Sequence, residues 1–113
     1  VQEVFRKNVQ KFQSLQHNSG RLAQVATLLE IPVISTQQTP KKLGETIPEV
    51  VKFHGPLVKR FDKTEFTMYE PGVIKHLKSC PQKKVVLYGL ETHVCVRQTC
   101  FDLLQHDYEV HVV

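Results

Sequence analysis

The sequence predicts an α/β fold built on a mostly parallel sheet. Short apolar segments that read as strands alternate along the chain with segments of helical periodicity, which is the pattern of βαβ units. The apolar run at 85–88 lacks the polar alternation of a half-exposed strand, as strands of buried parallel sheets do. Hydrophobic residues make up 41% and charged residues 23% of the 113 residues, so a single globular domain is expected.

The first half of the chain predicts one helix and two strands. In residues 13–30 apolar side chains recur at steps of three and four, so a helix is expected, with Gly20 weakening its middle. Strands are expected at 31–35 and 57–60. Between them, residues 36–53 are expected to form a long connection, and connections of this length in compact domains are usually functional or disordered.

The second half predicts a further alternation of helices and strands. The expected order is a loop at 63–69, a helix at 71–78 with proline in its first turn, a strand at 85–88, a helix at 94–105 and a strand at 108–113. Parallel sheets bind ligands at the carboxyl ends of their strands. A site is therefore expected after residue 88.

Composition narrows the expected setting and partners. The three cysteines form no CxxC motif and no disulfide framework, which favours a reducing, cytoplasmic location, with mitochondrion and peroxisome as alternatives. The net charge is +4, but the basic residues are dispersed rather than arranged in a stripe, so nucleic-acid binding is not expected. No apolar run approaches the roughly 20 residues of a membrane span, so no membrane partner is expected either.

A cysteine follows the buried strand at 85–88. Residues 89–96 (GLETHVCV) lie where this strand ends and the next helix begins. The free amides and positive dipole end of a helix start favour an anion, so Cys95 is expected to form the reactive thiolate readily. The alternative is a buried structural cysteine.

Nucleophilic catalysis by cysteine also needs a proton acceptor and donors for an oxyanion. If the strands at 57–60 and 85–88 are parallel, Lys63 emerges at the same sheet edge as Cys95. Lys63 is therefore the cationic candidate, although composition alone favours a solvated surface lysine. Asp62 is a candidate partner acid, with a place on the loop surface as the favoured alternative. The histidines show no HxxxH or HxH spacing, so neither a metal site nor a cofactor is expected.

Residues 89–96 resemble the G-x-x-T-x-x-C-V nucleophile motif of the isochorismatase-like cysteine hydrolases. The match is closest to the eukaryotic isochorismatase domain-containing proteins. Further resembling segments follow in the family's order, at 2–6 (QEVFR), 36–46 (the substrate loop), 63–68 (KTEFTM) and 109–113 (EVHVV). The resemblance covers residues 1–113 as one domain and implies a three-layer αβα, Rossmann-like fold.

The resemblance implies a triad of Asp, Lys and Cys. Its lysine falls on Lys63 and its cysteine on Cys95. The backbone N–H groups of Glu91 and Cys95 would form the oxyanion hole. A non-proline cis peptide between Leu90 and Glu91 would aim the Glu91 amide at the oxyanion.

The aspartate of this triad falls immediately before Val1. We therefore expect the sequence to be part of a longer protein, truncated at both ends. The strand that carries this aspartate is central in the family's sheet. Without it, the strands at 31–35 and 57–60 are expected to have no bridge to those at 85–88 and 108–113.

The substrate loop departs from the family pattern. Gln37, Thr39 and Phe66 are the expected substrate-loop residues. Gln37 stands where the family has Glu, Thr39 where it has Tyr, and Lys42 where it has Gly. The metal-binding D-x-H of nicotinamidases is missing around 36–44, which argues against a nicotinamidase.

The function that the resemblance implies is hydrolysis of a small molecule. Amidase-type cleavage of a C–N bond is favoured over cleavage of a vinyl ether. The alternative is an inactive family member that acts as a binding or oligomeric partner protein. A role in RNA processing ranks third and is motivated only by the pI near 9.1. Family members commonly form dimers or tetramers, so a homo-oligomer is expected.

Overall fold

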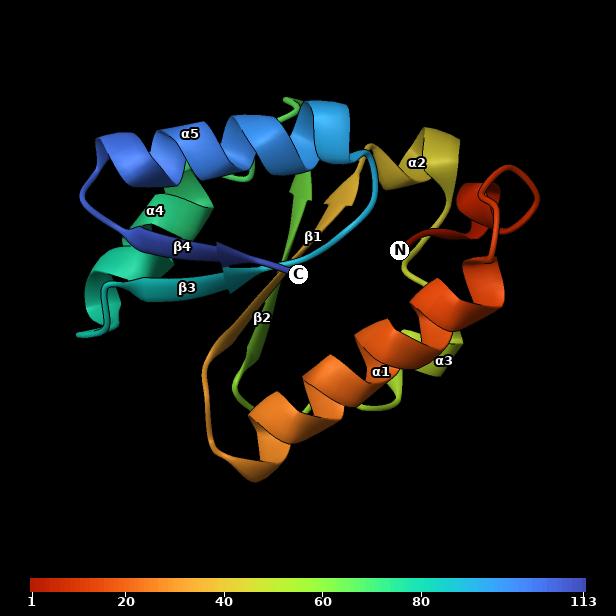
Figure 1. The fold of residues 1–113 in the computed structure, drawn as a ribbon, viewed down its shortest axis with the longest axis horizontal. Helices are drawn as coiled ribbons and strands as arrows, with labels where there is room; N and C mark the ends of the chain where they lie inside the picture. Colours follow the sequence, from red (N-terminus) through yellow and green to blue (C-terminus); the bar gives the residue numbers. More distant parts are fainter. The chain divides into compact units, whose positions relative to one another are not determined.

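The computed structural model describes all residues, Val1–Val113, and divides into two compact units (Figure 1). The first unit is Val1–Asp62 and the second is Lys63–Val113. Each unit combines helices with a pair of strands, which agrees with the predicted α/β class. None of the helices has both the length and the apolar character that crossing a bilayer requires.

The elements follow one another in the predicted alternation. In the first unit they are η1 Glu3–Arg6, α1 Phe12–Leu28, β1 Val33–Gln38, α2 Pro40–Leu43, α3 Pro48–Val51 and β2 Val58–Lys63, whose last residue belongs to the second unit. In the second unit they are α4 Pro71–Ser79, β3 Lys84–Leu87, the π-helical turn η2 Thr92–Val96, α5 Arg97–Gln105 and β4 Glu109–Val112.

The four strands form two separate sheets of two strands each. β1 lies beside β2, and the two arrows point the same way in Figure 1. β3 pairs with β4 in parallel, with Lys84 opposite Glu109 and Leu87 opposite Val112. The expectation that the first two strands are not hydrogen-bonded to the last two is confirmed.

The segment between β1 and β2 is more ordered than the sequence predicted. Residues 36–53 were expected to form a connection, yet β1 continues to Gln38 and two short helices follow. Both helices have proline at their first position, Pro40 in α2 and Pro48 in α3. Proline lacks an N–H and has a fixed φ, so it suits the start of each of these helices.

The core of the first unit forms where α1 meets α3. Phe12, Ile47 and Val50 are buried together, and Ile47 has no exposed surface. Gly20, in the middle of α1, allows a close approach, because a Cβ at this position would lie 3.0 Å from the ring of Phe53. The glycine that weakens the helix by propensity therefore makes room for an aromatic side chain.

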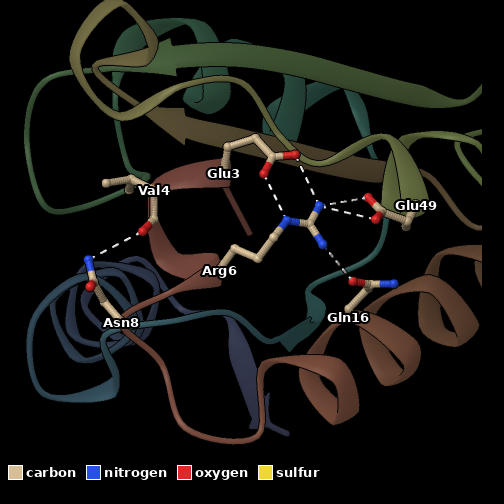
Figure 2. Close-up of polar contacts among 6 residues, drawn as sticks. All are labelled: Glu3, Val4, Arg6, Asn8, Gln16 and Glu49. Atoms are coloured by element: carbon tan, nitrogen blue, oxygen red, sulfur yellow. Dashed lines mark hydrogen bonds and ion pairs between the residues drawn. The ribbon is translucent and has the colours of Figure 1, made fainter.

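Arg6 connects three parts of the first unit at the surface (Figure 2). Its guanidinium donates to both carboxylate oxygens of Glu3, to the carboxylate of Glu49 in α3, and to the side chain of Gln16 in α1. Hydrogen bonds from Arg6 hold the pKa of both carboxyl groups below their ordinary values. Because these groups are exposed, the cluster fixes geometry more than it adds stability.

The second unit is built around α5. Figure 1 shows α5 alongside β4, and it contacts both β4 and η2. The buried apolar side chains of this unit are Val73, Leu87, Val96, Leu103 and Tyr108. They come from α4, β3, η2, α5 and the residue before β4, so all the elements of the unit except β4 contribute to its interior.

Replacing Ile47 with alanine tests the core of the first unit. Ile47→Ala removes a fully buried side chain and leaves a cavity, so the free energy of unfolding should fall by about 2–5 kcal/mol. Leu28→Ala is the matched control, because Leu28 is 74% exposed and should change stability by less than about 0.5 kcal/mol. Urea denaturation measures both, and equal losses in the two variants would contradict this account of the core.

Candidate active site

The turn between β3 and α5 holds Cys95. Glu91 adopts the left-handed conformation with φ of 61°, and its carbonyl oxygen accepts hydrogen bonds from the N–H groups of Val94 and Val96. The chain then enters the π-helical turn η2, in which Cys95 is half-buried with a free thiol. Cys95 therefore lies between a strand and a helix, as predicted, and π-helical turns of this kind are frequent at functional sites.

Lys63 ends β2, and its side chain is buried. Only 6% of the residue is exposed, so it is not the solvated surface lysine that composition favoured. Its ammonium group donates to the carbonyl oxygens of Glu65 and Phe66 at 2.8 and 2.9 Å. The same nitrogen lies 3.9 Å from the sulfur of Cys95. The predicted lysine and cysteine are therefore brought together in the second unit.

The surroundings of Lys63 act on its protonation in two directions. Burial lowers the pKa of the Lys63 amine below its ordinary value, because the charged form loses its hydration. The charges of Cys95, Glu70 and Glu65 and the hydrogen bond to Cys95 oppose this lowering. A negative charge on Cys95 thus favours the ammonium form of Lys63.

Thr99 is a part of this arrangement that the sequence did not single out. It lies in α5, one helical turn after Cys95, and is 2% exposed. Its hydroxyl donates to the carbonyl oxygen of Cys95 at 2.7 Å and accepts from the N–H of Met68 at 2.9 Å. The i,i+4 spacing from Cys95 was the available signal, but it does not reveal the contact with Met68.

The backbone around Glu91 bears on the expected oxyanion hole. The hydrogen bonds around this turn include none donated by the Glu91 N–H, so this amide has no acceptor there. The expected cis peptide between Leu90 and Glu91 is wrong, because the structure has no cis peptide bond. The chain reverses instead through the left-handed Glu91, a conformation that costs about 1–2 kcal/mol for a residue with a side chain.

Gln37 is buried in the first unit with all its polar atoms engaged. Its amide nitrogen donates to the carboxylates of Glu45 and Asp62 at 2.7 and 2.9 Å. Its oxygen accepts from both the N–H and the hydroxyl of Thr46, each at 3.1 Å. Gln37 therefore organises the inner side of the 36–46 loop, and Asp62, considered above as a partner acid, binds Gln37.

The other two expected substrate-loop residues have different surroundings. Thr39 is left-handed, with φ of 36°, and precedes α2, and its carbonyl oxygen accepts from Lys42 and Leu43. Phe66 lies in the second unit on the loop after Lys63, and 61% of its surface is exposed. Its carbonyl contacts Lys63 while its ring remains open to a ligand. The structure contains no group of three or more His, Cys, Asp or Glu side chains that could hold a metal ion.

Comparison with known proteins identifies relatives over the whole chain. The family model described as the isochorismatase domain matches residues 1–113. Isochorismatase domain-containing protein 2 of Xenopus laevis is 42% identical over 114 residues, covering 100% of this chain and 54% of that protein. The secreted isochorismatase effector Isc1 of Phytophthora sojae is 46% identical over 117 residues, covering 100% of this chain and 56% of that protein.

The solved structures agree in fold. The structure named MAR1 ribonuclease from Caenorhabditis elegans superposes with a TM-score of 0.93 at 42% identity, over 99% of this chain and 57% of that one. The chain thus spans about half the length of the relatives that it matches. With the family model matching over its full length, the chain belongs to the isochorismatase domain family.

Proposed function

We propose that the protein is a cysteine hydrolase of a small molecule, with Cys95 as nucleophile and Lys63 as its cationic partner. The observation that carries this proposal is the buried Lys63 nitrogen, 3.9 Å from the Cys95 sulfur. A lysine is rarely buried without a partner, because its charge then loses hydration. The two residues also occupy the lysine and cysteine positions of the family motif.

The proposed reaction is hydrolysis of a C–N bond in two steps. The Cys95 thiolate adds to the carbonyl carbon, and the carbonyl oxygen takes up the negative charge. The C–N bond then breaks, the amine leaves with a proton, and an acyl group remains on the sulfur. Water releases this acyl group as a carboxylic acid, which restores the thiol. By the resemblance, an aspartate of the family triad is the proton carrier.

In this proposal Lys63 and the Glu91 amide stabilise different negative charges, the first on the sulfur and the second on the oxyanion. The Lys63 ammonium stabilises the thiolate before the attack. Its bonds to the carbonyls of Glu65 and Phe66 hold it in place, so it does not have to reorganise. The Glu91 N–H, which donates to no group around its turn, would stabilise the oxyanion together with the N–H of Cys95. The exposed ring of Phe66 is the proposed apolar contact for the substrate.

A catalytically inactive partner protein is the alternative reading of the same residues. The altered substrate loop and the absence of the triad aspartate from residues 1–113 motivated it. The Gln37 departure is weak evidence for a lost activity, because this side chain hydrogen-bonds Glu45, Asp62 and Thr46 within the first unit. Assembly into a homo-oligomer remains part of both readings, and size-exclusion chromatography with light scattering would decide it.

RNA cleavage is the second candidate function. One structure that is 42% identical carries the name ribonuclease, and the present chain has a pI near 9.1. Against it, the basic residues do not form a continuous stripe in sequence. Incubation with single-stranded RNA at low and at physiological salt, with RNA degradation as the readout, tests RNA cleavage separately from hydrolysis of a small molecule. Degradation that persists in Cys95→Ala would exclude the proposed cysteine chemistry for RNA.

Removal of the thiol tests the proposed hydrolysis. Cys95→Ala in the full-length protein should lower turnover of a panel of small amides and carbamoyl compounds by on the order of 10³-fold or more, because the nucleophile is lost. Cys100→Ala is the matched control, since Cys100 is a half-buried free cysteine of α5 outside the proposed site. Full turnover by Cys95→Ala would overturn the proposal.

Thiol alkylation separates a reactive cysteine from an inert one without a known substrate. Iodoacetamide should modify Cys95 faster than Cys80 or Cys100, because only Cys95 has a lysine ammonium beside it. Peptide mass spectrometry at each cysteine measures the three rates. In Lys63→Met the advantage of Cys95 should disappear. Alkylation of Cys95 no faster than of the other two would favour the inactive partner protein.

The lowered pKa of Lys63 predicts a pH dependence of stability. The folded protein releases the Lys63 proton more readily than the unfolded chain does, so its free energy of unfolding rises as pH approaches the ordinary lysine value of 10.5. The test compares Cys95→Ala, which lacks the neighbouring thiol, with the double variant Cys95→Ala/Lys63→Met. Between pH 7 and pH 10 the free energy of unfolding of Cys95→Ala should rise relative to that of the double variant. Urea denaturation at each pH measures it, and a constant or decreasing difference would contradict the assignment.

A further inference from the structure

The loop after β2 is held to α5 by one buried hydroxyl. Thr99 is 2% exposed and contacts both segments. A threonine hydroxyl has one proton to donate and lone pairs that accept. The proton goes to the Cys95 carbonyl oxygen at 2.7 Å, which leaves the lone pairs for the Met68 N–H at 2.9 Å. Both bonds are satisfied at once.

The same loop holds the Lys63 amine. The ammonium group donates to the carbonyls of Glu65 and Phe66, which lie three and two residues before Met68. The contacts therefore run from the Lys63 nitrogen to the Phe66 carbonyl, along the backbone to the Met68 N–H, to the Thr99 hydroxyl and on to the Cys95 carbonyl. This route joins the two atoms whose separation is 3.9 Å. A second contact, the stacking of Tyr69 on His106 at 4.4 Å between ring centroids, fixes the loop to the residue after α5.

We propose that Thr99 is a positioning residue, whose hydroxyl sets the separation between the Lys63 ammonium and the Cys95 sulfur. The inference rests on the proposed function, because it assigns Thr99 a part in the reactivity of Cys95. The two hydrogen bonds of the Thr99 side chain go to the backbone of Cys95 and Met68. Thr99 acts on Cys95 through the carbonyl of that residue, and on Lys63 through the loop that begins with it.

A substitution that removes only the hydroxyl tests the proposal. Thr99→Val keeps the size and branching of the side chain but leaves the Met68 N–H without its buried acceptor. The loop should then release the Lys63 amine. A misplacement of about 1 Å can lower a rate by about 100-fold, so the alkylation of Cys95 should slow on the order of tenfold to 100-fold. Thr99→Ser keeps the hydroxyl and should retain the wild-type rate.

The chain offers a matched control in the first unit. The hydroxyl of Thr27 in α1 lies 3.0 Å from the carbonyl oxygens of both Ala23, four residues earlier, and Phe53, which share its one proton. Thr27→Val removes a hydroxyl that joins a helix to another segment, as Thr99→Val does, but from a helix that carries no part of the proposed site. It should lower the thermal midpoint as Thr99→Val does, yet leave the alkylation of Cys95 unchanged. A loss of reactivity that follows stability in both variants would mean that Thr99 has only a structural role, and it would overturn the proposal.

The experiment uses the full-length protein and iodoacetamide, with the rates at Cys80 and Cys100 as internal references. If wild-type Cys95 has no advantage over these two, the proposed function fails. If wild-type Cys95 has the advantage and folded Thr99→Val keeps it within about twofold, only the positioning role fails. Should Thr99→Val not fold, Thr99→Ala and Thr99→Ser replace it, since both lose the methyl group and only the first loses the hydroxyl. Equal rates in those two variants would also overturn the proposal.

Discussion

The buried ammonium of Lys63 is the constraint on which the second unit depends. A lysine that is 6% exposed must direct its N–H donors to acceptors, or its burial is strongly unfavourable. It finds two carbonyl oxygens in the loop that follows it and one sulfur in η2. The loop must therefore fold back so that its carbonyls contact the Lys63 side chain, and η2 must bring Cys95 close to the same nitrogen. The fold of the loop and the environment of the thiol share one cause.

The sequence could predict those features that depend on local pattern. The strands and α1 follow from their apolar patterns, and α4 from the proline in its first turn. Cys95 was singled out by its place after the apolar run at 85–88; the expectation that this strand is buried is wrong, because Val86 is 58% exposed and only Leu87 of β3 is buried. Lys63 was predicted beside Cys95 on the condition that the strands at 57–60 and 85–88 are parallel. These strands belong to separate sheets, and the observed contact is the 3.9 Å between the Lys63 nitrogen and the Cys95 sulfur. The helices at 40–43 and 48–51 were missed because proline marks both loops and helix starts, and packing of Ile47 and Val50 decides between them. Thr99 was missed because its second partner, Met68, is 31 residues away.

The departure from the family pattern at position 37 has a local physical reason. The family's glutamate would bring a third carboxylate beside those of Glu45 and Asp62, and repulsion would raise its pKa. Glutamine has nearly the same shape and supplies two N–H donors, one for each of these carboxylates. Its oxygen, held by Thr46, fixes which end of the amide faces the acids. Glutamine at position 37 thus makes all four contacts without adding a third negative charge.

This local reason changes what the departure says about function. If Gln37 were a free substrate contact, its exchange for the family's glutamate would indicate a different substrate or a lost activity. Its four hydrogen bonds are all made inside the first unit, so the exchange is explained by its own neighbours. The difference in substrate must then be sought in side chains that remain open, of which Phe66 is the clearest, with 61% of its surface exposed on the loop that Lys63 and Thr99 hold.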